Sequence, residues 1–548
     1  SSNITYDVTR GDKTSTITTG TLNIATGSTA AINYIQMASG SALNPGAIGS
    51  STIALPGYVL LDNTYGCTGT GCTPATGYIT SSSIASATTS TGVTVNNAIY
   101  AKDSITINGI TNSGNYGVLM VANLTSNTGN ITISGVSTTG FGVTNWNGAW
   151  GANAITANSG AVSITGSATG GQGVVLETSH SISSKSITIV GTVTTGAYAV
   201  RAGAMTIVAG GTNINVTGTV GTSTNYGIYD TGTITDNAAG SNISFISNGV
   251  IYQTGAISLV ANTTSAPANI TYDTTRDGSA SSITAGALTI GSGSTSAINY
   301  IVKTNGATIS VPAISVPGYV VLDNTCLGCG SATTPTSAAT NANAITITGA
   351  LSAGALAGST GVTINAVANG TGVGFTQGTN AISSSAGGVI ITVNGQAGTA
   401  YSSSGSITAT YQPIAITTTT TTGAGISNTG AISGGVVTLN STESTSTSTA
   451  MAISATGAIT ANALTVNATG GASSTIVSLG AITINAGGSD INVTARNAAA
   501  GTNTGITQTG AIVDNAVGSN IVFTSNNKIV QNGAISLAAN TSGSAATV

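Results

Sequence analysis

The sequence has very little charge. Lys, Arg, Asp and Glu together make up 4% of the 548 residues, and the net charge is −4, whereas ordinary soluble domains are roughly 25% charged. So few basic residues form no stripe that could hold a nucleic acid, and nucleic-acid partners are therefore not expected.

The 13 acidic residues and the single histidine are also too few and too scattered for a typical catalytic or metal centre. Enzymes that cleave polysaccharides need acids that converge on one face. Here the recurrent acids sit in repeated turn contexts and are predicted to cap turns: Asp7 and Asp273, Asp62 and Asp323, and Asp236 and Asp514. The sequence predicts no catalytic residue, no cofactor and no metal, and we expect a protein that is not an enzyme.

Long apolar runs and helical patterns are missing too. Apolar residues come in short alternating runs such as "SITIVGTV" at 186–193, far below the 18 or so consecutive positions that a membrane helix needs. Glycines interrupt most windows of helical length, and no 3.6-residue periodicity is present. Neither a transmembrane segment nor a helical repeat is predicted.

What the sequence does contain favours a folded, all-β chain. Hydrophobic residues make up 40%, which is too much for disorder, and glycine contributes 76 residues against 8 prolines. The remainder is rich in β-branched residues and Asn, which suit pleated strands and tight corners.

A long repeat divides the chain. "NITYDVTRGD" begins at Asn3 and "NITYDTTRDG" at Asn269, and "PGYVLLDNT" at 56–64 returns as "PGYVVLDNT" at 317–325. The segment from Asp236 reappears from Asp514. We therefore expect two tandem units, residues 1–266 and 267–548.

A short repeat lies within each unit. Gly-Ala-Ile begins at Gly430, Gly457, Gly480, Gly510 and Gly533, and strand-like patterns centre on Ile105, Ile131, Val162, Ile187 and Ile214. Periods of about 23 to 30 residues indicate stacked structural repeats. Alternation places Ile and Val inward and Thr, Ser and Asn outward, so the prediction is a parallel β-solenoid (β-helix) of about 20 coils.

Two pairs of cysteines follow the shared "PGYV" segments. Cys67 and Cys72 occur in the first unit, and Cys326 and Cys329 in the second. Equivalent pairs in a charge-poor chain suggest one small disulfide loop per unit. Free thiols and a metal site remain as alternatives, although a zinc site needs four ligands.

Both tryptophans stand close together, with Phe141 before Trp146 and Trp150. Aromatic rings beside Asn can stack on sugars, so these residues are a candidate glycan-binding patch. The alternative is a loop whose rings pack on the solenoid or against a neighbouring chain.

The phrases "GAISL" at 533–537, "GAITINAGG" at 480–488 and "SITI" at 186–189 resemble the repeat regions of filamentous-haemagglutinin-type exoproteins. These are bacterial surface adhesins built on right-handed parallel β-helices. The resemblance implies export to the cell surface or the extracellular space and a role in adhesion, biofilm or surface structure. It transfers no catalytic residue.

These features lead to one functional expectation and one alternative. We expect a structural subunit of an extracellular fibre, sheath or surface array that polymerises with itself, both laterally and head to tail, because open solenoid ends expose strand edges. The predicted junction comprises Asn3, Ile4, Thr5, Tyr6, Asp7, Ile535 and Leu537. A longer tandem array would extend the repeats in the same way. The alternative is the stalk of an adhesin that binds glycans or surfaces.

Overall fold

The computed structural model describes residues 2–8, 15–64, 91–112, 115–146, 153–276, 281–325, 343–356, 361–445, 448–472, 475–497, 503–539 and 547. Within these ranges there is no α-helix, and parallel strands stack coil upon coil as a β-solenoid of about 17 turns. The predicted fold class is confirmed. The described chain separates into two compact units, one dominated by residues 1–261 and the other by residues 293–548.

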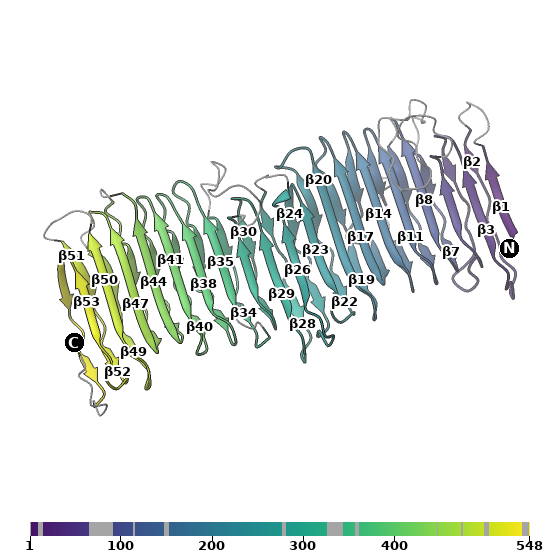
Figure 1. The fold of residues 1–548 in the computed structure, drawn as a ribbon. Coiled ribbons are helices and arrows are strands. Elements are labelled where there is room, and N and C mark those ends of the chain that lie inside the picture. The colour runs from purple at the N-terminus through teal and green to yellow at the C-terminus, as the bar shows by residue number, and fades with distance from the viewer. Residues whose placement is uncertain are drawn as a thin grey trace. The chain divides into compact units, whose positions relative to one another are not determined.

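Each coil of the first unit contributes strands to up to three parallel sheets, here called A, B and C (Figure 1). Sheet A contains β1 (Ser2–Asp7), β3 (Ile32–Met37), β5 (Val59–Asp62), β8 (Ile105–Thr111), β11 (Ile131–Ser137), β14 (Ala161–Ala168), β17 (Ser186–Val193), β20 (Asn213–Val220) and β23 (Asn242–Ser247). Sheet B contains β2 (Ile17–Thr18), β4 (Leu43–Asn44), β6 (Val93–Val95), β9 (Tyr116–Met120), β12 (Phe141–Thr144), β15 (Gln172–Val175), β18 (Tyr198–Ala202), β21 (Tyr226–Asp230) and β24 (Val250–Gln253). Sheet C contains β7 (Ile99–Ala101), β10 (Leu124–Ser126), β13 (Ala154–Ala157), β16 (Ser181–Ser184), β19 (Ala204–Ile207), β22 (Ile234–Asp236) and β25 (Ile257–Leu259).

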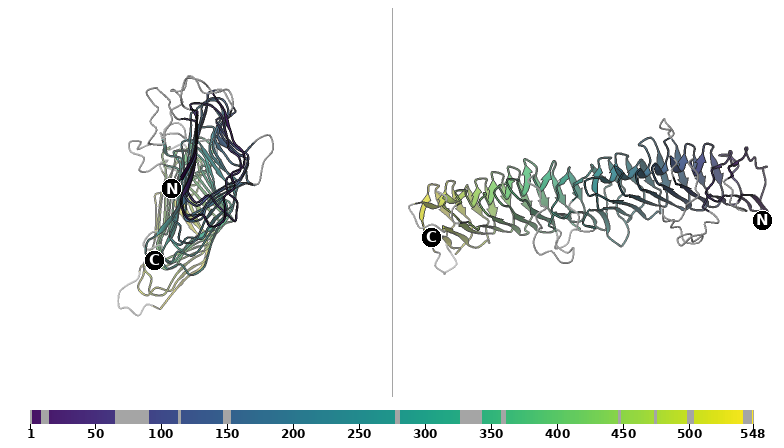
Figure 2. Two further views of the ribbon diagram at one scale, coloured as in Figure 1. Left: turned by 90° about the vertical axis from the view of Figure 1, so that its right-hand side faces the viewer. Right: turned by 90° about the horizontal axis from the view of Figure 1, so that it is seen from above.

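The second unit has the same three-sheet plan, and Figure 2 shows the stacking of its strands from above. Its sheet A contains β29 (Ile298–Lys303), β32 (Val320–Asp323), β35 (Val362–Val367), β38 (Val389–Asn394), β41 (Ile414–Thr420), β44 (Val436–Glu443), β47 (Ala463–Gly470), β50 (Ile491–Asn497) and β53 (Ile521–Ser525). Its sheet B contains β27 (Ile283–Thr284), β30 (Ile309–Val311), β33 (Ile345–Ile347), β36 (Phe375–Gly378), β39 (Tyr401–Ser403), β42 (Ile426–Asn428), β45 (Ile453–Ala455), β48 (Thr475–Leu479), β51 (Thr504–Gln508) and β54 (Lys528–Gln531). Its third sheet, also called C, contains β31 (Ile314–Val316), β34 (Leu351–Ala353), β37 (Ile382–Ser384), β40 (Ile407–Ala409), β43 (Ile432–Ser433), β46 (Ile459–Ala461), β49 (Ile482–Ile484), β52 (Ile512–Asp514) and β55 (Ile535–Leu537). The strands β26 (Ala268–Asp273) and β28 (Leu288–Ile290) contain residues of both units.

Equivalent residues of successive short repeats pair with one another in the parallel sheets, so each short repeat forms one coil. Ile131 pairs with both Ile105 and Val162, and Ile187 pairs with both Val162 and Ile214. The isoleucines of the Gly-Ala-Ile motifs pair in the same way along sheet C of the second unit. The chain makes about 17 turns, somewhat fewer than the expected number of about 20, and two of its coils are long: Val59 pairs with Ile105, and Val320 pairs with Val362.

Alternation within the strands fills the interior with apolar side chains. In β17 the inward Ile187 and Ile189 are fully buried, while Thr188 faces outward and is half-buried. Stacked copies of such residues form the core of each coil, and burying each side chain stabilises the fold by about 1.5–3 kcal/mol. The predicted inward and outward assignment is confirmed in this strand.

Glycine allows two backbones to touch inside the first unit. Gly166 of sheet A faces Gly173 of sheet B, and a Cβ atom on Gly166 would lie 2.3 Å from the Gly173 carbonyl oxygen. In-register glycines repeat this close approach in the coils above and below, at Gly135 and Gly191. A side chain at these positions would push the two sheets apart.

The glycine of the Gly-Ala-Ile motif has a similar role at a corner. A Cβ atom on Gly457 would lie 2.0 Å from the carbonyl oxygen of Gly430, its equivalent one coil earlier. A buried polar side chain fixes the same corner: Asn428 Nδ2 donates to the Gly430 carbonyl oxygen at 2.7 Å. The Gly-Ala-Ile motif therefore marks a corner at which the turns of successive coils stack closely.

Asparagines at equivalent positions of neighbouring coils bond to one another, as the solenoid model predicts. Asn33 donates to Asn3 at 2.8 Å, and Asn299 donates to Asn269 at 3.0 Å. The first bond is exposed and the second is partly buried, and each ties one coil to the next.

Candidate functional site

Several predicted site residues lie outside the described part of the chain. These are the four cysteines, Cys67, Cys72, Cys326 and Cys329, and the second tryptophan, Trp150. The disulfide prediction therefore stays a prediction.

The remaining predicted aromatic residues, Phe141 in β12 and Trp146 just after it, are half-buried and lie together in the first unit. The rings of Phe141 and Trp146 meet edge to face, with centroids 5.9 Å apart. Tyr116, one coil earlier, stacks on Phe141 with centroids 5.7 Å apart and an interplanar angle of 23°. The sequence did not point to Tyr116, since only the pairing of Tyr116 with Phe141 between β9 and β12 brings it to this group.

A second aromatic group, also unpredicted, lies further along the same sheet. Tyr198 stacks on Tyr226 with centroids 5.4 Å apart, and Tyr229 stacks on Tyr252 at 5.2 Å. The Arg201 guanidinium lies 5.6 Å from the centre of the Tyr229 ring, within cation–π range.

Arg201 also makes an ion pair. Its Nη2 atom lies 2.7 Å from Oε1 of Glu177, a glutamate that is almost fully buried. The tyrosine rings contact one another from coil to coil, both stacked and edge to face. This group is therefore well suited to stiffening three successive coils.

His180 and Asp230 are fully buried ionisable groups of the first unit. Burial lowers the pKa of His180 to about 4, and burial raises the pKa of the Asp230 carboxyl well above its usual range, with a smaller opposing effect of the Gly232 backbone N–H. Asp230 takes the corner position at which the second unit has an amide, Asn428. Both groups are therefore expected to affect the pH dependence of stability.

The recurrent aspartates cap turns, as predicted. Asp62 Oδ1 accepts bonds from the backbone N–H and the hydroxyl of Thr64 at 2.8 and 2.5 Å, and Asp323 does the same with Thr325 at 2.8 and 2.6 Å. Asp514 accepts a bond from the Ala516 backbone N–H at 3.0 Å. Within the described residues, no group of three or more His, Cys, Asp or Glu side chains is placed to hold a metal ion.

The predicted junction residues lie on strands that have a neighbour on one side. Asn3 to Asp7 belong to β1, which pairs with β3 and is largely exposed. Ile535 and Leu537 belong to β55, which pairs with β52. Their exposed fractions are 36% and 52%, whereas Ile512, one coil earlier, is fully buried.

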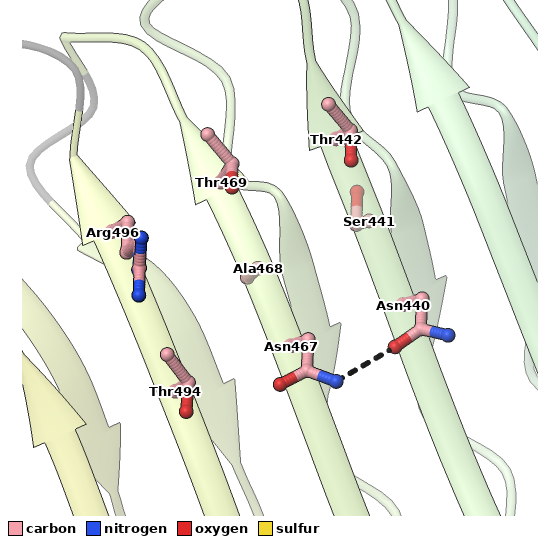
Figure 3. Close-up of a pocket in the computed structure, with 8 residues that line it drawn as sticks. All are labelled: Asn440, Ser441, Thr442, Asn467, Ala468, Thr469, Thr494 and Arg496. Atoms are coloured by element: carbon pink, nitrogen blue, oxygen red, sulfur yellow. Dashed lines mark hydrogen bonds between the residues drawn. The ribbon is translucent and has the colours of Figure 1, made fainter.

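A polar hollow of about 430 Å³ lies over sheet A of the second unit (Figure 3). Outward side chains of three successive strands line it: Asn440 and Thr442 from β44, Asn467 and Thr469 from β47, and Thr494 and Arg496 from β50. Asn467 Nδ2 donates to Asn440 Oδ1 at 3.1 Å. No sequence motif marked this hollow, because its residues come from three coils.

No family model matches the chain, and neither the curated proteins nor the solved structures compared with it contain a match. No helix in the described part of the chain is long and apolar enough to cross a membrane. The assignment of function therefore depends on the chain's own residues.

Proposed function

We propose that the chain is a structural subunit of an extracellular fibre, sheath or surface array, joined head to tail through its solenoid ends. The proposal is carried by the two copies of "NITYD". In the internal copy Tyr272 is fully buried, whereas in the first copy the equivalent Tyr6 is 40% exposed.

The internal copy shows what covers this tyrosine. Tyr272 stacks on Phe245 with ring centroids 5.0 Å apart, and its hydroxyl donates to Gln253 Oε1 at 2.8 Å. The second long repeat carries Phe523 and Gln531 at the positions equivalent to Phe245 and Gln253. Phe523 and Gln531 of one subunit thus match the two residues that Tyr6 of the next subunit would contact.

The edge of β53 supports the same arrangement. The Ile521 backbone N–H donates to the Thr547 carbonyl oxygen at 2.8 Å, and the Thr547 N–H donates to Asn520 Oδ1 at 3.0 Å. This edge therefore accepts a following segment in the position where the repeat places Asn269. A joined subunit would place its Asn3, the equivalent of Asn269, there instead of Thr547, and would continue the ladder with Ile4 to Asp7.

Low charge favours close lateral contact as well, since little repulsion keeps neighbouring solenoids apart. The repeat phrases that resemble filamentous-haemagglutinin-type exoproteins support a bacterial cell-surface or extracellular location. The proposal gives the chain no catalytic role.

Electron microscopy of the purified protein tests the proposal. Filaments are expected, and deleting residues 1–12 is expected to abolish end-to-end growth while the remaining coils stay folded, because solenoid stability is mostly nearest-neighbour. Tyr6→Ser should shorten the filaments, whereas Tyr411→Ser, which alters a highly exposed tyrosine at a turn, should not. Dispersed monomers at all concentrations, or filaments of normal length after the deletion, would contradict it.

A second candidate function is the stalk of a glycan- or surface-binding adhesin. It is favoured by the row formed by Tyr116, Phe141 and Trp146, since Trp and Tyr combine apolar rings with a polar atom. On a glycan array, saturable binding that is lost in Trp146→Ala but retained in Tyr411→Ala would favour the adhesin. The absence of any Trp146-dependent signal would reject it.

A further inference from the structure

The hollow in the second unit is a regular grid of outward side chains. Asn440, Asn467 and Thr494 pair in register across β44, β47 and β50, and Thr442, Thr469 and Arg496 form a parallel row two residues further along. Neighbouring coils are about 4.8 Å apart, and residues i and i+2 of a strand are about 6.6 Å apart. Six polar side chains therefore share one small, open surface (Figure 3).

Most of the hydrogen-bonding capacity of this grid is unused by the protein. Within the described residues, the hydroxyls of Thr442, Thr469 and Thr494 make no side-chain hydrogen bond, and Arg496 is exposed without an ion-pair partner. The Asn467–Asn440 bond leaves Asn440 Nδ2 and Asn467 Oδ1 available. The hollow thus offers a guanidinium, amide groups and hydroxyls to one ligand.

The described acids near this face do not compete for Arg496. Glu443 is on β44, but its side chain is buried on the inner face, where Oε2 accepts a bond from the Gly471 N–H at 2.7 Å. Asp490 precedes β50 and accepts bonds from Asn520 at 2.8 and 3.2 Å. The electrostatic character of the hollow is therefore positive and favours an anionic ligand.

We infer that this hollow binds an acidic oligosaccharide, with a sugar carboxylate on Arg496 and ring hydroxyls on the Asn and Thr rows. A guanidinium binds a carboxylate through two parallel hydrogen bonds. The volume of about 430 Å³ suits a ligand of a few sugar residues. The outward Thr417 and Thr419 of β41 continue the two rows by one coil, so that an extended chain can lie across the coils.

This binding site is independent of the head-to-tail contact and of the aromatic row in the first unit. Its test therefore uses the whole chain in whatever assembly state it has, with binding as the readout. Isothermal titration or ligand-observed NMR with trigalacturonate is compared with maltotriose, a neutral trisaccharide, and with the galacturonate monomer. Saturable binding of trigalacturonate, much weaker binding of maltotriose and weak binding of the monomer are expected.

The variant Arg496→Gln should weaken trigalacturonate binding about tenfold, as expected for loss of one charge-assisted contact. Lys303→Gln is the matched control, since Lys303 is an exposed cation on sheet A of the same unit but outside the hollow. It should leave the affinity unchanged. Asn467→Ala should also weaken binding, although it removes no charge.

Three results would overturn the inference. One is the absence of trigalacturonate binding at millimolar concentration. Another is equal binding of maltotriose or of the monomer, which would indicate nonselective or merely ionic contact. The third is an equal loss in Arg496→Gln and Lys303→Gln, which would mean that overall charge is responsible.

Discussion

The contact between sheets A and B of the first unit gives the sharpest stability prediction. In Gly166→Ala the new Cβ would lie 2.3 Å from the Gly173 carbonyl oxygen, 2.6 Å from its carbonyl carbon and 2.7 Å from Val174 Cγ2. Carbon–oxygen contacts between strands ordinarily measure about 3.3–3.6 Å, so the two backbones must separate by about 1 Å. Overpacking of this kind costs about 1–3 kcal/mol or more, and the upper end is expected because backbone atoms held in a ladder cannot rotate away.

Urea unfolding followed by circular dichroism measures the total loss, and hydrogen exchange locates it. Because each coil contacts mainly its neighbours, the loss of protection should centre on β14, β15 and the coils directly above and below. Gly170→Ala is the matched control from the same coil, between β14 and β15. Its Cβ would lie 3.6 Å from the nearest atom, the Thr138 carbonyl oxygen. If both variants proved equally stable, the close approach of the two sheets would not limit stability, and the reasoning would be wrong.

Three further predictions concern buried side chains of the first unit. Ile187→Asp should lower the free energy of unfolding by several kcal/mol because it buries an unpaired carboxylate, while Thr188→Asp should lower it only slightly. Urea unfolding of both variants tests this, and a larger loss in Thr188→Asp would overturn the inward and outward assignment. Burial keeps the pKa of His180 at about 4, below its ordinary value of 6.5. The contribution of the neutral His180 to the free energy of unfolding is therefore fully present above pH 6.5, and about 3 kcal/mol is lost as the pH falls to about 4. His180→Leu should make the stability depend less on pH between pH 6.5 and 4, and an unchanged pH dependence would exclude this cause. Burial raises the pKa of Asp230, so stability is lost as the pH rises above the ordinary carboxyl range. Asp230→Asn should therefore raise the melting temperature at neutral pH. A lower melting temperature of this variant would show that the carboxylate is stabilising.

The sequence could predict those features of the fold that depend on local alternation. Successive strand residues point to opposite sides, so the inward direction of Ile187 and the outward direction of Thr188 can be predicted from the sequence of β17 alone. Equivalent positions of successive coils are also legible, because the Gly-Ala-Ile glycines must recur wherever a coil's backbone passes close to the next. Turn capping by Asp62 and Asp323 followed from their repeated context.

The candidate surfaces could not be predicted in this way, because they depend on which residues of different coils become neighbours. Coil length varies, so the distance in sequence between stacked residues is not constant: Tyr116 meets Phe141, while Val59 meets Ile105. The tyrosine group around Arg201 and the hollow around Arg496 each combine residues from three coils. The sequence by itself determined the solenoid and its inward side chains, since these follow from short-range periodicity, whereas only the tertiary structure decided the outer surfaces, since these follow from the register of one coil on the next.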